Sequence, residues 1–139
     1  MKREVTVTID GLQADDEGEA VSITVPGIYH FRDNKHYIHY EENAVHGEET
    51  TKNLIKITED RVELTKTGRN STQMLFHRKE ATETVYHTPY GTLLLEIRTS
   101  ELTITKMQDE IRVKLLYTLW ADGSRLSDNQ VSIRICSRM

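Results

Sequence analysis

Hydrophobic and polar residues alternate along most of this chain, as they do in β-strands that bury one face. The clearest case is the segment 111–119, in which every second residue is apolar: Ile111, Val113, Leu115, Tyr117 and Leu119. No apolar stripe recurs at helical spacing over roughly eleven or more residues, so we expect no helix of ordinary length. The pattern predicts about ten strands joined mostly by short turns. They form a single domain covering residues 1–139.

A tight turn at Asp33-Asn34 is expected to pair two aromatic strands. A two-residue turn brings an apolar and aromatic set onto one face, which we assign inward: Tyr29 opposite Ile38, Phe31 opposite His36, and Gly27 opposite Tyr40. The same register gathers three side chains on the outer face: His30, Tyr37 and His39. This hairpin therefore predicts an aromatic inner wall and a separate outer surface rich in histidine.

Two more turns predict registers in which apolar residues face one another. The turn Glu59-Asp60 gives three facing pairs: Ile57 with Val62, Ile55 with Leu64 and, on the other face, Lys56 with Glu63. The turn Gln108-Asp109 gives two: Ile104 with Val113, and Leu102 with Leu115. Between these segments the apolar phase shifts from odd to even positions at 99–101, so a β-bulge is expected there.

The strongest signal for the end of a strand and a chain reversal lies in the stretch 86–91, Tyr-His-Thr-Pro-Tyr-Gly. Pro89 ends one strand because its φ is fixed and it lacks an N–H, and Gly91 can take the positive φ of a reversal. The Leu-rich run 93–95 that follows is then expected to be buried. Further on, the polar residues 121–129 are expected to form a loop before the last apolar strand, 131–135.

Strands in hairpin order, with no helices to cover them, would leave the unpaired N–H and C=O groups of the edge strands exposed. Closure into a single up-and-down antiparallel β-barrel of about 8–10 strands avoids this best. A sandwich of two sheets is the alternative, but Greek-key sandwiches need longer connections than the short turns expected here. The interior of a barrel of this size is either filled by side chains or able to hold one small ligand.

Five segments carry a resemblance that covers nearly the whole chain: Gly27-Ile28-Tyr29, Tyr37-Ile38-His39-Tyr40-Glu41-Glu42, Ile55-Lys56-Ile57, Tyr86-His87-Thr88-Pro89-Tyr90-Gly91 and Leu115-Leu116-Tyr117-Thr118-Leu119. In this order they resemble the YwiB-like family of small bacterial proteins of unknown function. The fourth segment is the most specific piece. The resemblance implies a calycin-type, lipocalin-like β-barrel in a bacterial cytosol. It brings no established catalytic or binding residues, so none is carried over.

The formal net charge of −4 removes the electrostatic reason to expect nucleic acid as a partner. No apolar run approaches the ~20 residues of a membrane span, and no signal-peptide core follows Met1. We therefore expect a soluble cytoplasmic protein, as a monomer or homodimer. The single Cys136 excludes an intramolecular disulfide and a cysteine-based metal site, and no motif indicates a cofactor.

The residues that invite a metal or catalytic hypothesis each have a plainer interpretation. His30 and His39, with Glu41 nearby, are ligand types that zinc accepts, but an exposed histidine pair without a third fixed ligand is favoured. Glu41 and Glu42 point to opposite faces of a strand and cannot act together on one substrate. Glu42 alone enters the barrel mouth, where Arg98, Lys66 or a tyrosine hydroxyl is a candidate partner for its charge. No serine elbow is found, so enzymatic activity is not favoured.

Aromatic walls with a few polar groups are how barrel pockets hold small amphipathic molecules. The predicted ligand-binding set lies at the barrel interior and rim: Tyr29, Phe31, His36, Tyr40, Glu42, Tyr86, Tyr90, Arg98 and Tyr117. The first hypothesis is a non-enzymatic barrel that binds a small, partly apolar ligand inside, although the same side chains can simply fill the core. The second is a protein-interaction module that uses the outer histidine surface. The third is an enzyme that uses Glu42 or His36 at the barrel mouth.

Overall fold

The computed structural model describes residues 2–13, 20–42, 51–67, 72–88 and 91–138. Within these ranges the chain forms ten β-strands: β1 (Lys2–Gln13), β2 (Ala20–Arg32), β3 (Lys35–Glu42), β4 (Thr51–Ile57), β5 (Arg61–Thr67), β6 (Thr72–His77), β7 (Thr82–Thr88), β8 (Gly91–Lys106), β9 (Glu110–Ala121) and β10 (Ser124–Ser137). In β9, Ile111, Val113 and Leu115 are buried while Arg112 and Lys114 between them are exposed. The period-two pattern of the sequence is therefore the pattern of burial.

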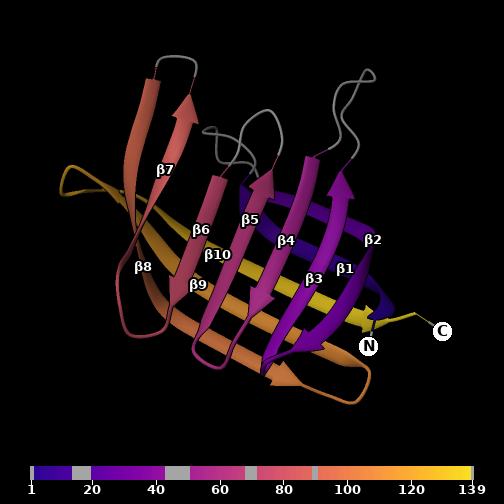
Figure 1. Cartoon of the computed structure of the whole chain (residues 1–139). Helices are drawn as coiled ribbons and strands as arrows, with labels where there is room; N and C mark the ends of the chain where they lie inside the picture. Colours follow the sequence, from indigo (N-terminus) through magenta and orange to yellow (C-terminus); the bar gives the residue numbers. More distant parts are fainter. Residues whose placement is uncertain (1, 14–19, 43–50, 68–71, 89–90, 139) are drawn as a thin grey trace.

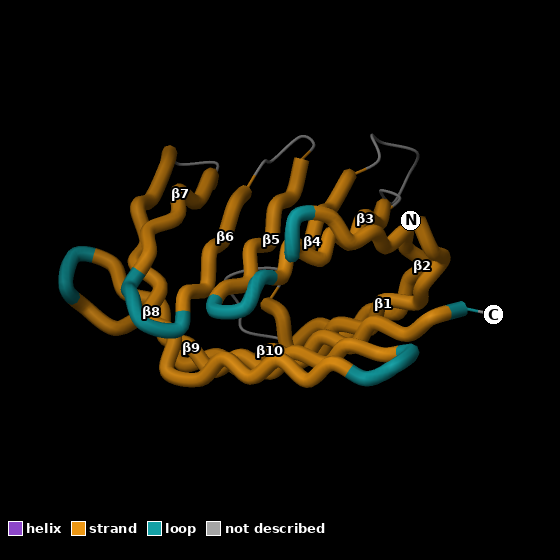
Figure 2. The backbone as a smooth tube through the Cα atoms, turned by 60° about the horizontal axis from the view of Figure 1, so that its bottom comes forward, coloured by secondary structure: helices purple, strands orange, loops and turns teal. Residues whose placement is uncertain are grey.

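The strands form one antiparallel sheet in the order β6-β5-β4-β3-β2-β1-β10-β9-β8-β7. Strands that follow one another in sequence are neighbours, except for β6 and β7, and the pairing of β1 with β10 joins the first strand to the last. Figure 1 shows β3 to β6 crossing in front of β1, β9 and β10. Figure 2 shows that β2 and β8 pass from one side to the other, so the sheet curls around a common interior.

The two end strands of the sheet, β6 and β7, meet along a seam. No backbone ladder joins them in the described ranges. Instead, two threonine hydroxyls of β7 donate to carbonyls of β6: Thr82 Oγ1 to Leu75 O, and Thr84 Oγ1 to Gln73 O. The sheet is therefore a nearly closed up-and-down barrel, which confirms the predicted fold and excludes the two-sheet sandwich.

The predicted registers are confirmed at three hairpins. The facing pairs are those expected: Tyr29 with Ile38, Phe31 with His36, Ile57 with Val62, Ile55 with Leu64, Lys56 with Glu63, Leu102 with Leu115, and Ile104 with Val113. The register of β8 against β9 also shifts between Thr99 and Glu101, so the expected bulge is present. A bulge bends its strand, and β8 changes from one side of the barrel to the other (Figure 2).

Aliphatic side chains from both sides of the barrel form its core. Those that are almost completely buried are Val7, Ile9, Ile38, Ile55, Ile57, Val62, Ile97, Leu115, Val131 and Ile133. Phe76 and Tyr117 meet within this core in an edge-to-face arrangement, with ring centroids 4.7 Å apart. The inner face predicted from alternation is therefore the packed core of the barrel.

Two predictions about burial are wrong. Phe31 is 49% exposed rather than inward, because it stands at the end of β2 next to the turn. Leu93 and Leu94 are 50% and 59% exposed rather than buried. Leu94 alternates with the buried Leu95 and so lies on the outer face of β8. Leu93 is on the inner face but stands three residues before Glu96, where the pairing of β8 with β9 begins. An apolar residue outside the closed part of a barrel has nothing to pack against.

The predicted loop at 121–129 is also wrong, because β10 already begins at Ser124. Asp122 and Gly123 form a tight turn with positive φ angles of 49° and 77°, as expected for a two-residue hairpin connection. At the other predicted corner, Thr88 pairs with Gly91, whose φ is 130°. Pro89 and Tyr90 lie outside the described residues.

Candidate functional site

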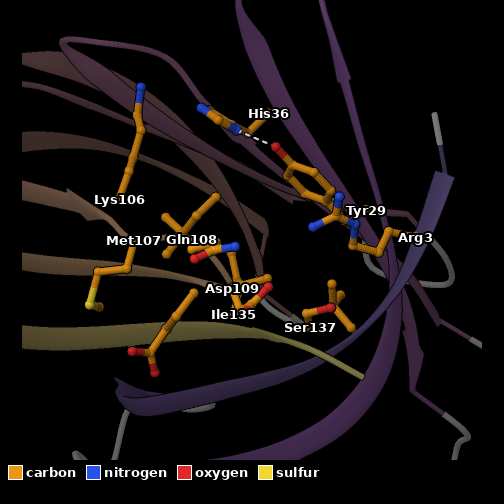
Figure 3. Close-up of a pocket in the computed structure, with 12 residues that line it drawn as sticks. Arg3, Tyr29, His36, Lys106, Met107, Gln108, Asp109, Ile135 and Ser137 are labelled. Carbon is orange, nitrogen blue, oxygen red and sulfur yellow. Dashed lines mark hydrogen bonds between the residues drawn. The ribbon is translucent and has the colours of Figure 1, made fainter. Parts of the chain in front are cut away.

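An open cavity of about 200 Å³ lies at one end of the barrel (Figure 3). Its lining comes from β1, β2, β3, β8, β9, β10 and the β8–β9 turn: Arg3, Val5, Tyr29, His36, Lys106, Met107, Gln108, Asp109, Glu110, Ile111, Ile135 and Ser137. Figure 3 shows Tyr29, His36 and Arg3 on one side, with Lys106 and Met107 on the other.

The up-and-down topology explains why residues so distant in sequence meet here. In a meander, alternate turns lie at the same end of the barrel, so the β2–β3 turn and the β8–β9 turn share an end. The start of β1 and the end of β10 lie there too. The Ser137 N–H donates to Asp109 O at 2.9 Å, and the Arg138 N–H donates to Glu4 O at 3.0 Å. These backbone hydrogen bonds hold the end of β10 against β1 and the β8–β9 turn, which line the cavity.

Tyr29 and His36 form the polar centre of the cavity wall. The Tyr29 hydroxyl lies 2.7 Å from Nδ1 of His36, and the two rings are stacked with centroids 5.8 Å apart. Burial raises the pKa of Tyr29, an effect that the charge of Arg3 opposes. Burial lowers the pKa of His36, and the charge of Lys106 lowers it further. At neutral pH the pair is therefore an uncharged phenol and an uncharged imidazole.

The second ring nitrogen of His36 has no hydrogen-bond partner within the described part of the chain. His36 is only 7% exposed, and its Nε2 is buried. In Figure 3 this nitrogen points away from Tyr29, toward the side of the cavity where Lys106 lies. Buried polar atoms in folded proteins are almost always hydrogen-bonded. The Nε2 of His36 is thus a buried donor or acceptor without a partner, on a residue that lines the cavity.

Four charged side chains line the cavity, two of each sign: Arg3, Lys106, Asp109 and Glu110. Glu110 is already neutralised, because Arg134 and Arg112 donate to its carboxylate and Cys136 Sγ lies 3.3 Å from Oε1. The hydrogen bonds from Arg134 and Cys136 hold the pKa of Glu110 below its usual value. Among the described residues, Arg3, Lys106 and Asp109 form no ion pair. The cavity lining therefore contains two unpaired cations, Arg3 and Lys106, and one unpaired carboxylate, Asp109.

The bottom of the cavity is apolar. Val5, Ile111 and Ile135, which we call the aliphatic floor, are 3%, 8% and 3% exposed and belong to the barrel core. They come from β1, β9 and β10, which pair in the sheet through Val5 with Ser137 and Ile111 with Ile135. The cavity thus combines an apolar base with polar and charged walls, as small-molecule sites do.

The structure separates the other predicted ligand-binding residues from this cavity. Tyr40 and Glu42 lie toward the far end of β3, and six residues of strand place Glu42 about 20 Å from His36. Tyr117 is 3% exposed within the core. Arg98 does not pair with Glu42: it binds Glu96 and lies over the Trp120 ring, 3.9 Å from its centroid. The Tyr86 side chain and all of Tyr90 lie outside what the structure describes.

The outer histidine surface is assembled as predicted. The His30 ring is stacked on Tyr37 with centroids 5.0 Å apart, and on His39 with centroids 5.3 Å apart. The two imidazoles lie face to face at 15°, so their rings are packed against each other. Among the described residues, no group of three or more His, Cys, Asp or Glu could hold a metal ion.

The sequence reasoning found Tyr29 and His36 but missed the charged residues of the cavity. Arg3 lies directly opposite Tyr29 in the β1–β2 pairing, and Lys106 lies opposite Ile111 in the β8–β9 pairing. A signal was present in the order of the turns. An up-and-down barrel puts every second turn at one end, so Asp33-Asn34 and Gln108-Asp109 had to share an end.

Together the fold and the cavity define a class, an antiparallel β-barrel with a small open site at one end. The sequence matches, over residues 5–133, the model of a family described as "Domain of unknown function (DUF1934)", and the chain belongs to this family. The crystal structure of the ywiB protein from Bacillus subtilis has the same fold, with a TM-score of 0.78 and 18% sequence identity. The match covers 99% of this chain and 94% of that one, so the resemblance to the YwiB-like family is confirmed.

No curated protein matches the sequence. The described residues include no helix that is long and apolar enough to span a membrane.

Proposed function

We propose that this protein is a non-enzymatic, cytoplasmic binding protein that holds a small, partly apolar molecule at the open end of its barrel. The observation that carries the proposal is the buried, unpartnered Nε2 of His36 at the wall of an open cavity. A ligand in the cavity supplies the missing hydrogen-bond partner. The aliphatic floor offers the apolar surface on which most small-molecule sites depend.

The proposed site lies at the barrel end, not in the barrel centre. Phe76 and Tyr117 pack against each other in the core, whereas Tyr29 and His36 line the cavity. Binding is favoured over catalysis because the two acid–base candidates, His36 and Glu42, lie toward opposite ends of β3. General acid–base chemistry needs such groups within reach of one substrate.

Native mass spectrometry of the protein after incubation with a cell extract tests this proposal. We expect a bound small molecule in the wild type, with NMR shift changes at Tyr29 and His36. The variant Ser137→Trp places a large ring in the cavity lining and should abolish both signals. Ser124→Trp, at an exposed site where β10 begins, should change neither. A ligand that binds Ser137→Trp as well as the wild type, or no ligand at all, would overturn the proposal.

A second candidate function is protein interaction through the outer histidine surface. The stacked His30, Tyr37 and His39 lie on the same face as Ile28, which is 39% exposed. Exposed apolar and aromatic side chains that adjoin one another are typical of interaction sites. A photoreactive residue at position 28 should then crosslink a protein in cells, and one at the exposed Lys52 should not. Equal crosslinking at the two positions would argue against this function.

A further inference from the structure

We propose that the molecule held at the barrel end is a small organic carboxylate. Its anion lies among Arg3, Lys106 and His36, and its apolar part lies on the aliphatic floor. This inference rests on the proposed binding function and specifies its ligand class.

The charges of the cavity favour an anion. Glu110 is neutralised by Arg112 and Arg134, which do not line the cavity, so its carboxylate is not available to a ligand cation. Arg3 and Lys106 then outnumber Asp109. They stand on opposite sides of the cavity (Figure 3), so an anion placed between them is attracted from both.

His36 supplies a donor that fits a carboxylate oxygen. When the Tyr29 hydroxyl donates to Nδ1, the neutral imidazole carries its proton on Nε2. Nε2–H is then a buried donor without an acceptor among the described residues. A hydrogen bond from this N–H to an ionised acceptor is shorter and stronger than one to a neutral acceptor. With the hydrogen bond in this direction, the phenol sets the tautomer that a carboxylate needs.

The size and the floor of the cavity restrict the rest of the ligand. A volume of about 200 Å³ is below the roughly 300–1,000 Å³ of sites for drug-sized molecules. The aliphatic floor offers no hydrogen-bonding side chain, so an inorganic anion would leave it uncovered. A short aliphatic carboxylate satisfies both the charged wall and the floor.

Calorimetry at pH 7 and low salt with four probes tests the ligand class: hexanoate, acetate, hexan-1-ol and hexylamine. We expect hexanoate to bind most tightly, with acetate and hexan-1-ol each weaker by about tenfold or more and hexylamine weakest. Lys106→Ala and Arg3→Ala should each weaken hexanoate by about tenfold and leave hexan-1-ol unchanged. Both residues are exposed, so the variants should fold. Lys52→Ala, a matched change on β4 outside the cavity, should alter nothing.

The outcomes separate this inference from the proposed function. If hexan-1-ol or hexylamine binds as tightly as hexanoate, and Ser137→Trp abolishes that binding, the site exists but the carboxylate class is wrong. If hexanoate binds equally well to the wild type and to Lys106→Ala and Arg3→Ala, the assignment of its anion is wrong. If none of the probes binds the wild type, the inference fails, and the extract experiment then decides the proposed function by itself.

Discussion

Phe76 of β6 and Tyr117 of β9 meet edge to face inside the barrel, with ring centroids 4.7 Å apart. Phe76 is completely buried and Tyr117 is 3% exposed. β6 is one end of the strand order, and β9 lies two strands from the other end. The ring pair therefore joins the two parts of the sheet that border the seam, in addition to filling the core.

Phe76→Ala should destabilise the protein by about 3–5 kcal/mol, because it removes a buried ring and leaves a cavity. The chain offers a matched control in Phe31, which is 49% exposed. Phe31→Ala should cost less than about 1 kcal/mol. Chemical denaturation of both variants measures the free energies of unfolding. Similar losses for the two would contradict the assignment of Phe76 to the core.

Thr84→Val should loosen the seam. Thr84 is buried and its hydroxyl donates to Gln73 O, so the substitution removes a hydrogen bond across the seam, at a cost of about 0.5–1.5 kcal/mol. Amide hydrogen exchange should accelerate in β6 and β7 before it does in β1 or β10. Thr103→Val, at an exposed site on β8, should leave the exchange unchanged. Uniform acceleration along the chain would mean that the seam has no separate stability.

His36 should make the stability of the protein depend on pH between about 7 and 5.5. The folded protein lowers the pKa of His36 through burial and the charge of Lys106. Below about pH 6.5 the unfolded chain therefore takes up a proton that the folded one does not, and stability falls as the pH falls. For one proton the slope is at most about 1.4 kcal/mol per pH unit.

His36→Gln, which cannot titrate, should reduce this slope. Unfolding midpoints measured at pH 7.5, 6.5 and 5.5 check it. Asp60 and Glu110 also have lowered pKa values, but their stabilisation is lost below about pH 5, outside this window. An unchanged slope in the variant would place the pH dependence on another group.

Gly11 and Gly123 should respond differently to alanine, although both have positive φ angles, 91° and 77°. A Cβ on Gly11 would clash with the backbone oxygen of Gln130, whereas a Cβ on Gly123 meets nothing within 4 Å. Gly123→Ala should cost about 1–2 kcal/mol from the backbone conformation alone. Gly11→Ala should cost about 1–3 kcal/mol more, because the strand must also move. Thermal and chemical unfolding of the pair measure this difference.

The strands and their registers could be predicted because period-two burial and turn residues act locally. Ile57 and Val62 face each other on either side of a turn, and a slip by one residue would expose both. Exposure at the barrel ends could not be read in the same way. Leu93 and Leu94 are as apolar as Leu95, yet only Leu95 is buried: Leu94 lies on the outer face of the strand, and Leu93 lies three residues before Glu96, where the pairing with β9 begins.

Only those cavity residues that lie close together in the sequence could be predicted. Tyr29 and His36 share one hairpin, so the Asp33-Asn34 turn brings them together. Arg3 lies opposite Tyr29 in the pairing of β1 with β2, but Lys106 reaches the cavity from β8, and only the curling of the sheet into a barrel brings it near that hairpin. The same limit explains why Glu42 was grouped with His36. One strand carries both, but its length puts them at different ends.

The hydroxyls of Thr82 and Thr84 join β7 to β6, whereas the other neighbouring strands are joined by ladders of backbone hydrogen bonds. Parting these two strands turns the cylinder into a curled ribbon in which all nine ladders remain intact. Opening the barrel along this seam would therefore bring solvent to the interior through the wall, and it would require no strand to unfold.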